Sequence, residues 1–419
     1  MPPAPSGSAV SSAHLHLAVD LDGTGRHPAS WRDPAARPGE LFTAGYWAAL
    51  VAEAEAGLLD FVTFEDGLGP QSSNPLDPDE RTDQVRGRLD AVLIAARVAP
   101  LTRHIGLVPT VVATHTEPFH ISKAIATLDH VTSGRAGLRV RISARSDEAA
   151  HFGRRAIPRF QAYDSPEARE TVTGLFDEAA DHVEVVRRLW DSWEDDAEIR
   201  DAATGRFVDR DKLHHIDFEG RFFSVKGPST TPRPPQGQPV VTALAHQTVP
   251  FRLVARQADV GYVTPQDAAH ARAIVAEIRA EQEAAGRAED PLHIFGDLTV
   301  LLDDTAGAAR DRRQRLDDLA GGPFTDDARV FTGTAAQLAD LLEEFAQEGL
   351  TGFRLRPAVA AHDLPRVTRD LVPELQRRGR FRSRYEAGTL RGLLGLDRPA
   401  SRYAPGDPAP AAPRTIPVA

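Results

Sequence analysis

The amino-acid sequence predicts a TIM-type (β/α)8 barrel with a long insertion after its fourth strand. Three observations lead to this prediction. Eight short β-rich runs are spread over the 419 residues, longer helical patterns lie between them, and one interval is far longer than the others. Strands that alternate with helices of this length favour a parallel sheet. Eight repeats favour a closed barrel over an open doubly wound sheet.

The predicted strands are short runs of the kind that a parallel sheet buries on both faces. They cover residues 15–21, 59–65, 104–112, 137–143, 239–245, 260–264, 292–302 and 352–356. In a barrel of this type the carboxyl ends of the strands carry the active site. Polar residues that follow these runs are therefore the first candidates for chemistry.

Helical patterns are clearest in four of the intervals. Residues 42–56 and 84–98 each place apolar side chains at helical spacing. Residues 176–190 carry one apolar stripe at steps of three and four residues, which predicts an amphipathic helix. Thr334 and Gln337 form a capping box that opens a helix over residues 338–347.

Roughly ninety residues, 144–235, separate the fourth strand from the fifth, far more than a usual crossover. We expect this insertion to lie on one face of a single barrel domain over residues 13–397. Residues 1–12 are predicted to form a flexible tail. Residues 398–419 are rich in Pro and Ala and predict an extended or disordered tail.

Composition excludes several classes of function. The net charge of −11 offers no general phosphate-neutralising surface, so no nucleic-acid partner is expected. The chain contains no cysteine, which excludes thiolate catalysis and Cys-ligated metal. No apolar run is long enough for a transmembrane helix, and no signal peptide is recognisable. We therefore expect a cytoplasmic protein without a membrane partner.

Known catalytic fingerprints are also missing. The segment Gly23-Thr-Gly25 begins like a dinucleotide fingerprint, but Pro28 stands where the third glycine belongs. No phosphate-binding P-loop, His-Glu-x-x-His motif or Gly-x-Ser-x-Gly elbow occurs. The paired histidines 14/16 and 214/215 lack further ligands, so no metal site is predicted.

Several polar residues follow predicted strands. His27 lies in the loop after the first strand and is either an acid/base group or a structural histidine. Asp66 follows the second strand and either serves the site or caps a turn. Thr110 and Thr114 at the end of the third strand could bind a cofactor or close a loop.

Arg139 and Arg141 alternate with apolar residues along the fourth strand. A strand that is buried on both faces cannot leave two guanidinium groups without partners. They form either ion pairs with acidic neighbours or a binding site for an anion.

Four stretches together resemble the luciferase-like flavin monooxygenases, in the branch of nitrilotriacetate monooxygenase component A. They are VEVVRRLWDSW (183–193), FEGRFFSVKGP (218–228) followed by PQGQP (235–239), LVPELQRRGRFRSRY (371–385) and TLRGLLGL (389–396). Residues 27–32 and the turn at Asp66 also fit. The resemblance covers roughly residues 14–400 and agrees with the barrel that the strand pattern predicts.

The resemblance implies a two-component monooxygenase. A separate flavin reductase would supply reduced FMN, which reacts with O2 and oxygenates a small organic substrate. By position, Asp66, Thr114 and Ser143 would approach the flavin. His27 and Tyr262 would line the reactive pocket. A homodimer or homotetramer is expected on the same ground.

The sequence departs from the family at the flavin phosphate. The family typically has Gln-Ala-Gly-Ser-Ser-x-x-Gly after the fifth strand, where this chain has ALAHQTVP (243–250). Pro250 replaces a glycine and removes an N–H donor. Arg139 takes the place of an asparagine, and Phe176 the place of a tyrosine.

We expect side chains to rebuild the lost phosphate site in place of backbone amides. The candidates are Arg139, Arg141, His246, Gln247 and Thr248. Two alternatives stay open: an oxidoreductase that uses a deazaflavin, and a non-catalytic barrel subunit that has lost flavin binding. The sequence does not identify the substrate.

Overall fold

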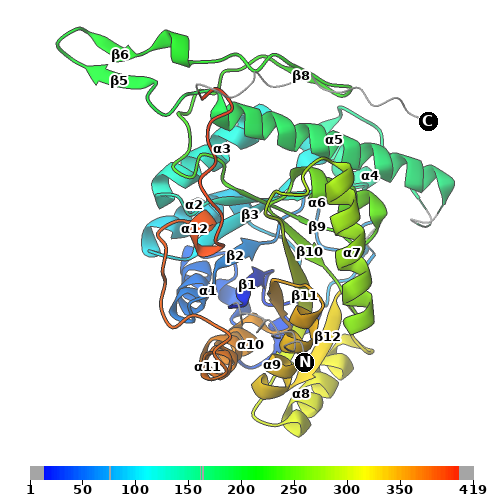
Figure 1. Cartoon of the computed structure of the whole chain (residues 1–419). Coiled ribbons are helices and arrows are strands. Elements are labelled where there is room, and N and C mark those ends of the chain that lie inside the picture. The colour runs from blue at the N-terminus through cyan, green and yellow to red at the C-terminus, as the bar shows by residue number, and fades with distance from the viewer. Residues whose placement is uncertain (1–13, 75–76, 161, 163–164, 405–419) are drawn as a thin grey trace, which may run out of the picture.

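The computed structural model describes residues 14–74, 77–160, 162 and 165–404. Eight parallel strands pair in the order β10-β9-β4-β3-β2-β1-β13-β11, and the barrel is closed because β10 also pairs with β11 (Figure 1). The barrel strands are β1 (His16–Leu21), β2 (Phe61–Phe64), β3 (Gly106–Val112), β4 (Gly137–Arg141), β9 (Val240–Leu244), β10 (Val260–Val263), β11 (His293–Leu302) and β13 (Gly352–Pro357). The predicted barrel and all eight predicted strands are confirmed.

A further parallel strand, β12 (Arg329–Gly333), was not predicted. The first half of β11 pairs with β10, and residues 298–302 of β11 pair with β12. Because β13 occupies the opposite edge of β11, β12 continues the barrel wall where β10 has ended. On this side the barrel wall therefore extends beyond the carboxyl ends of the other strands.

Several helices around the barrel begin at polar residues whose side chains cap the first turn. Thr43 caps α1 and Asp90 caps α2, while Thr334 and Gln337 form the predicted capping box of α9. The helices are α1 (Ala44–Ala56), α2 (Ala91–Val98), α3 (Pro118–Thr132), α6 (Thr248–Gln257), α7 (Ala268–Ala284), α8 (Ala306–Ala320), α9 (Ala335–Gln347), α10 (Ala360–Arg366) and α11 (Val372–Arg377). The prediction that α2 begins at residue 84 was wrong, since residues 84–90 belong to a loop that ends at the Asp90 cap.

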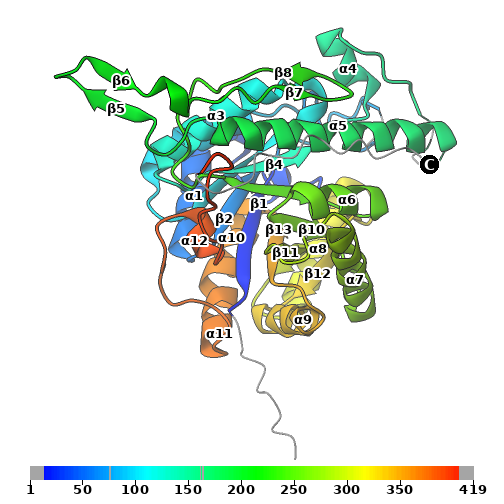
Figure 2. The same cartoon turned by 45° about the horizontal axis from the view of Figure 1, so that its top comes forward.

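The insertion contains α4 (Ser146–Phe152), α5 (Pro166–Asp191) and two small hairpins, β5–β6 and β7–β8. The hairpin strands are β5 (Glu198–Asp201), β6 (Arg206–Val208), β7 (Phe218–Glu219) and β8 (Ser224–Val225). Helix α5 contacts both α3 and α6 and so takes the place of the fourth barrel helix. Figure 2 shows the hairpins on the side of α5 that faces away from the barrel strands.

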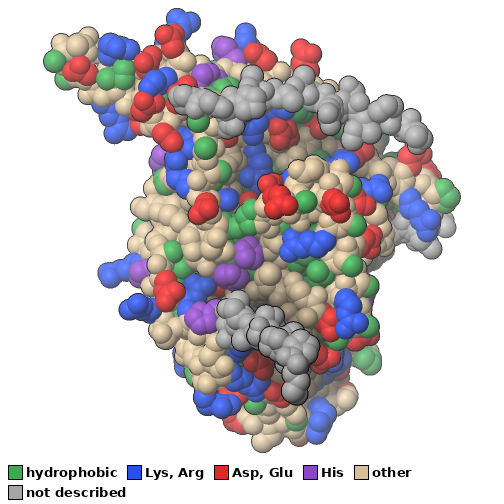
Figure 3. All heavy atoms as spheres, viewed as in Figure 1, with side chains coloured by type: hydrophobic (Ala, Val, Ile, Leu, Met, Phe, Trp, Pro, Cys, Tyr) green, Lys and Arg blue, Asp and Glu red, His purple; other side chains and the backbone are tan. Residues whose placement is uncertain are grey.

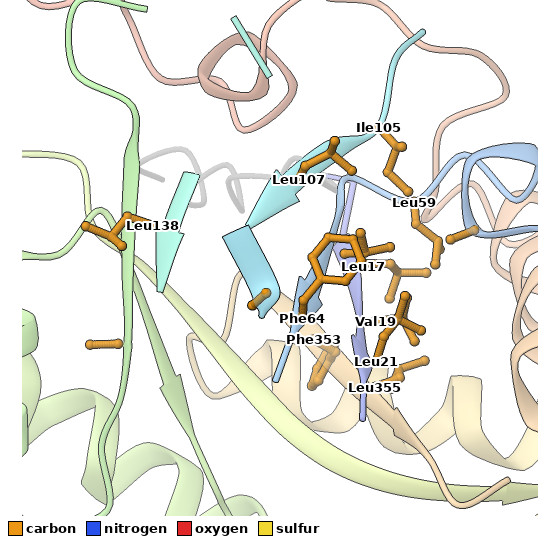
Figure 4. Packing of buried hydrophobic residues seen from close by; sticks show 14 of the residues in the cluster. Leu17, Val19, Leu21, Leu59, Phe64, Ile105, Leu107, Leu138, Phe353 and Leu355 are labelled. Carbon is orange, nitrogen blue, oxygen red and sulfur yellow. The ribbon is translucent and has the colours of Figure 1, made fainter. Parts of the chain in front are cut away.

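Side chains alternate between the two faces of each barrel strand. Leu17, Val19 and Leu21 of β1 point to one side and pack with Phe353 and Leu355 of β13 in the main hydrophobic cluster (Figure 4). The intervening residues of β1 point into the barrel. The faces of the strands that point toward the helices are therefore apolar. The faces that point into the barrel carry a different set of side chains.

The lower layer of the interior is apolar and is closed by the segment around α12 (Leu390–Leu393). Leu390, Leu394 and Leu396 pack against inward-facing residues of the strands, among them Phe61 and Phe295. The approach of Leu390 is close, because a Cβ atom at Gly106 would lie 2.7 Å from its Cδ1. The C-terminal segment therefore forms the floor of the barrel.

None of the helices in the described part of the chain is long and apolar enough to cross a membrane. On the face shown in Figure 3, acidic and basic side chains are interspersed over the surface. That face carries no broad area of one charge.

Leu390→Ala tests the floor of the barrel. Leu390 is fully buried, so the substitution should lower the free energy of unfolding by about 2–5 kcal/mol. Urea denaturation monitored by fluorescence measures this loss. Leu93→Ala, at an exposed position of α2, is the matched control. A loss at Leu390 no larger than that at Leu93 would contradict the assignment.

The buried His182 and the half-buried His293 should make stability depend on pH. Burial lowers the pKa of His182 and of His293 to about 4 from an ordinary value of 6.5. Below pH 6.5 the unfolded chain therefore binds protons that the folded chain does not. The free energy of unfolding should therefore decrease as the pH is lowered from 6.5 toward 4, by up to about 1.4 kcal/mol per pH unit for each histidine. Denaturation between pH 7 and pH 5 should show a weaker slope in His182→Leu, and an unchanged slope would refute this origin.

Candidate functional site

A cavity of about 1010 Å³ lies at the carboxyl ends of the barrel strands. Six segments and Phe176 of α5 line it: residues 22–30 after β1, 65–74 and 81–88 after β2, 139–148 from the end of β4, 244–253 from the end of β9 into α6, and 320–327 from the end of α8. The site is therefore built where barrels of this type carry their active sites. Most of its wall comes from loops.

A network of charged side chains fills the interior beneath the cavity. Arg354 of β13 binds Asp297 of β11, with its Nε 2.9 Å from Asp297 Oδ1. Arg356 binds the same carboxylate, with its Nε 3.0 Å from Oδ2. Arg139 of β4 forms an ion pair with Glu65 and a 3.0 Å hydrogen bond to Thr110 Oγ1.

The network decides which carboxyl groups are ionised. Burial opposes ionisation of Asp297, but Arg354 and Arg356 outweigh it, and the pKa of Asp297 lies below its ordinary value. Burial and the charge of Glu65 raise the pKa of Asp20, whose Oδ2 has no hydrogen-bond partner. Asp20 therefore retains a proton more readily than an ordinary aspartate does.

The loop after α8 is fastened to the barrel by two adjacent carboxylates. Asp327 lies 2.5 Å from Arg356 Nη1 and 3.1 Å from His246 Nε2. Asp326 lies 3.7 Å from Arg26 Nε. Burial works against ionisation of Asp327, yet the hydrogen bond to His246 and the charge of Arg356 lower its pKa. This loop is held in place as one wall of the cavity.

Four of the predicted site residues line the cavity: His27, Arg139, Arg141 and His246. The sequence left two roles open for Arg139 and Arg141, an ion pair or a binding site for an anion, and the two residues differ in this respect. Arg139 forms the ion pair with Glu65. Arg141 donates to the carbonyl oxygen of Asp66 at 2.6 Å and forms no ion pair among the described residues.

His27 lines the cavity with both ring nitrogens engaged. Its Nδ1 accepts a hydrogen bond from the amide of Ala29 at 3.1 Å, and its Nε2 lies 3.1 Å from Asp317 Oδ1. Burial lowers the pKa of His27. This arrangement describes a neutral imidazole that joins the loop after β1 to α8.

Tyr262 lies below the cavity and does not line it. Its ring is fully buried, with the guanidinium carbon of Arg354 4.1 Å from its centroid. Burial raises the pKa of its hydroxyl group. The structure therefore places Tyr262 as a support of Arg354, away from the predicted reactive pocket.

Asp66, Thr114 and Ser143 hold the loops at the rim together. Asp66 accepts hydrogen bonds from the amides of Gly67 at 2.7 Å and Ala91 at 2.9 Å, which is the turn-capping arrangement. Thr114 Oγ1 accepts a 3.0 Å hydrogen bond from the amide of Ser143. Like Thr110, these residues contact the protein and are absent from the cavity lining.

Gln247 and Thr248 are not brought to the cavity. Thr248 donates to Glu277 of α7 at 2.6 Å, and Gln247 is the exposed residue that precedes α6. The wall beside them is apolar and consists of Val140, Ile142, Phe176, Leu244, Pro250 and Leu253. The expected phosphate site at this helix is not rebuilt by these two side chains.

Sequence reasoning missed charged residues of the loops. Arg88, Arg145 and Glu148 line the cavity, as do Asp326 and Asp327. Arg145 and Glu148 follow directly after the predicted fourth strand, which was the available signal. In the part of the chain that the structure describes, no group of three or more His, Asp or Glu side chains is placed to hold a metal ion.

Comparison with known proteins identifies the family. The model of the luciferase-like monooxygenases matches residues 24–355. The chain belongs to this family. As a luciferase-like monooxygenase it is a flavin-dependent enzyme, which confirms the resemblance found in the sequence.

Two curated relatives are similar over nearly their full length. N-acetyl-S-(2-succino)cysteine monooxygenase of Bacillus subtilis (strain 168) is 30% identical, with 93% of this chain and 98% of the relative covered. Nitrilotriacetate monooxygenase component A of Aminobacter aminovorans is also 30% identical, with 94% and 99% covered. Among solved structures, long-chain alkane monooxygenase superposes with a TM-score of 0.80 at 23% identity, covering 91% of this chain and 95% of that chain.

Asp297→Asn tests the interior network. The substitution leaves Arg354 and Arg356 buried without their shared carboxylate, so we expect a loss of about 3–5 kcal/mol in the free energy of unfolding. Urea denaturation measures the loss. Asp304→Asn, which breaks an exposed ion pair with Arg366, is expected to leave the unfolding midpoint unchanged. Equal losses of unfolding free energy in the two variants would show that the buried network contributes no more to stability than an exposed ion pair does.

Proposed function

We propose that this monooxygenase is the oxygenase component of a two-component system. A separate flavin reductase supplies reduced FMN, which binds in the cavity at the barrel mouth, and the enzyme oxygenates a small organic substrate there. The observation that carries the proposal is the position of the cavity in a chain of this family. The absence of a nicotinamide fingerprint is consistent with a separate reductase.

The residues of the cavity are compatible with a flavin mononucleotide. Its volume of about 1010 Å³ is at the upper end of the range of small-molecule sites, about 300–1,000 Å³. The apolar wall near α6 suits a planar ring. Six arginines line the cavity and suit a phosphate: Arg26, Arg81, Arg88, Arg139, Arg141 and Arg145. The buried Nε of Arg139 has no hydrogen-bond partner among the described residues.

When bound, reduced FMN supplies the electrons that activate O2. The protein binds and orients the flavin and the substrate, and it excludes water from them. The loop of residues 320–327, fastened by Asp326 and Asp327, closes one side of the cavity. Most charged atoms of the ion pairs beneath it are bound within the protein, and Asp20 Oδ2 and Arg139 Nε are the exceptions in this network.

The names of the relatives do not select one substrate. They include nitrilotriacetate, dibenzothiophene sulfone and long-chain alkanes. A homodimer or homotetramer and a cytoplasmic location stay predictions from the resemblance and the composition.

Anaerobic titration with reduced FMN, oxidised FMN and a deazaflavin tests the cofactor. We expect reduced FMN to bind most tightly, as read by calorimetry. With a flavin reductase, NADH and ¹⁸O2, the product should carry the label. Preferential binding of the deazaflavin would instead indicate hydride transfer. No binding of any of the three would indicate a barrel that has lost catalysis.

A further inference from the structure

Two neighbouring carboxyl groups, those of Asp326 and Asp327, stand in the wall of the cavity. One nitrogen atom contacts both of them, since Arg356 Nη1 lies 2.5 Å from Asp327 Oδ1 and 3.4 Å from Asp326 Oδ1. Asp326 Oδ2 also accepts a hydrogen bond from the hydroxyl group of Thr299. Two carboxylates that share one cation repel each other, which favours a proton on one of them. We call these two residues the Asp326–Asp327 pair.

The ion pairs that reach the Asp326–Asp327 pair form one network, in which carboxyl groups outnumber guanidinium groups by one. Among the described residues, the six carboxyl groups belong to Asp20, Asp22, Glu65, Asp297, Asp326 and Asp327, and the five guanidinium groups belong to Arg26, Arg88, Arg139, Arg354 and Arg356. Arg141 is outside this network, since it forms no ion pair in the described part of the chain. Arginine does not give up its proton in proteins. The network is therefore one positive charge short when all its carboxyl groups are ionised, and one bound proton removes this deficit.

Three members of the network can hold this proton: Asp20, the Asp326–Asp327 pair, and His246, whose Nε2 lies 3.1 Å from Asp327 Oδ2. Asp20 is 3% exposed and does not line the cavity, whereas His246 and the pair do line it. Burial and the hydrogen bond with Asp327 raise the pKa of Asp326. The pair is therefore the place at which the network can both retain a proton and present it to the cavity.

The surroundings of the pair shelter one of its two members. The groups that face it are Arg26 from the loop after β1, Thr299 from β11, Arg356 from β13 and His246 from the segment after β9. Each of the two arginines also binds a further carboxylate, that of Asp22 or Asp297. The side chain of Asp326 is 10% exposed, whereas those of Asp327 and His246 are 38% and 39% exposed. Asp327 and His246 thus connect the sheltered Asp326 with solvent.

We propose that the Asp326–Asp327 pair holds one exchangeable proton and donates it to an oxygen atom of O2 in the cavity. The role in the reaction rests on the proposed function. In the overall reaction the O–O bond breaks, one oxygen atom bonds to the substrate, and the other leaves as water. The anion of reduced FMN supplies the electron pair and one hydrogen of that water, and the pair supplies the other. Without a substrate the O–O bond stays intact, and the same two hydrogens give hydrogen peroxide.

Neutron diffraction from a crystal grown in D2O at about pH 7, without flavin, locates the proton directly. We expect one deuteron on Asp326 or between Asp326 and Asp327, and none on Asp20. A deuteron on Asp20 would overturn the proposal. Deuterons on both ring nitrogens of His246, beside two ionised carboxyl groups, would overturn it as well.

Single-turnover kinetics test the delivery of the proton. The probe is the reoxidation of reduced FMN by O2 without a substrate, with the protein in excess and the absorbance of oxidised FMN as the signal. We expect the rate to fall as the pH rises, because the pair loses its proton. Asp326→Asn should be slower by about 10²-fold or more, the usual contribution of a general acid, and should lose this pH dependence. Asp304→Asn, at an exposed ion pair with Arg366, should keep both the rate and the pH profile.

Asp20→Asn tests the charge count without touching the pair. It removes one carboxyl group from the network and keeps the shape of the side chain, so the deficit disappears and the pair should lose its proton at lower pH. We expect the fall in rate to move to lower pH by about one unit, a tenfold change in proton affinity. An unmoved pH profile would contradict the count, also in the case that Asp326→Asn does not fold.

The two measurements separate this proposal from the proposed function. A wild-type rate and pH profile in Asp326→Asn would overturn the proton donor, although flavin binds and is reoxidised as the proposed function requires. If the deuteron lies on the pair but the protein binds no flavin, the stored proton stands, while its role in oxygen chemistry and the proposed function fail together.

Discussion

The carboxylate of Asp297, shared by the guanidinium groups of Arg354 and Arg356, is the interaction on which the barrel mouth depends. Arg354 continues from it to Asp20 on β1, and Arg356 continues to the loop after α8. A buried charge that loses its partner costs far more than the pair contributes. The positions of the strands at the mouth, of the loop after α8 and of the cavity floor are therefore determined together.

This network also separates the two ends of the barrel interior. Below it the interior is apolar and closed by Leu390. Above it, the cavity is surrounded mainly by loops, and the strand residues that reach it are few: residues 139–141 of β4 and Leu244 at the end of β9. The scaffold can then remain constant while the loops decide which ligand binds, which suits a family whose members act on substrates as different as alkanes and nitrilotriacetate.

The sequence was sufficient for the barrel and only in part for the site. The barrel strands are buried on both faces and rich in apolar residues, so they stand out, whereas β12 has the half-buried Arg329 and Thr332 and does not. Arg139 and Arg141 were found because charges in a buried strand need partners. Tyr262 was misplaced because the height of a residue within the barrel depends on the strand register, and the direction of Thr248 depends on its contact with α7. Arg88 belongs to a loop, where charged residues are common and carry no signal, whereas Glu148 belongs to the short helix α4 that follows the fourth strand.

The floor of the barrel has a consequence for biosynthesis. Residues 390–396 are translated after all eight barrel strands, yet they cover the apolar lower layer that includes Phe61 and Phe295. A nascent chain can assemble its strands first, but it keeps this layer open to water until the C-terminal segment has left the ribosome. During that interval an unfinished barrel exposes its own core and is most vulnerable to aggregation, so the last part of the domain to be made is the part that completes it.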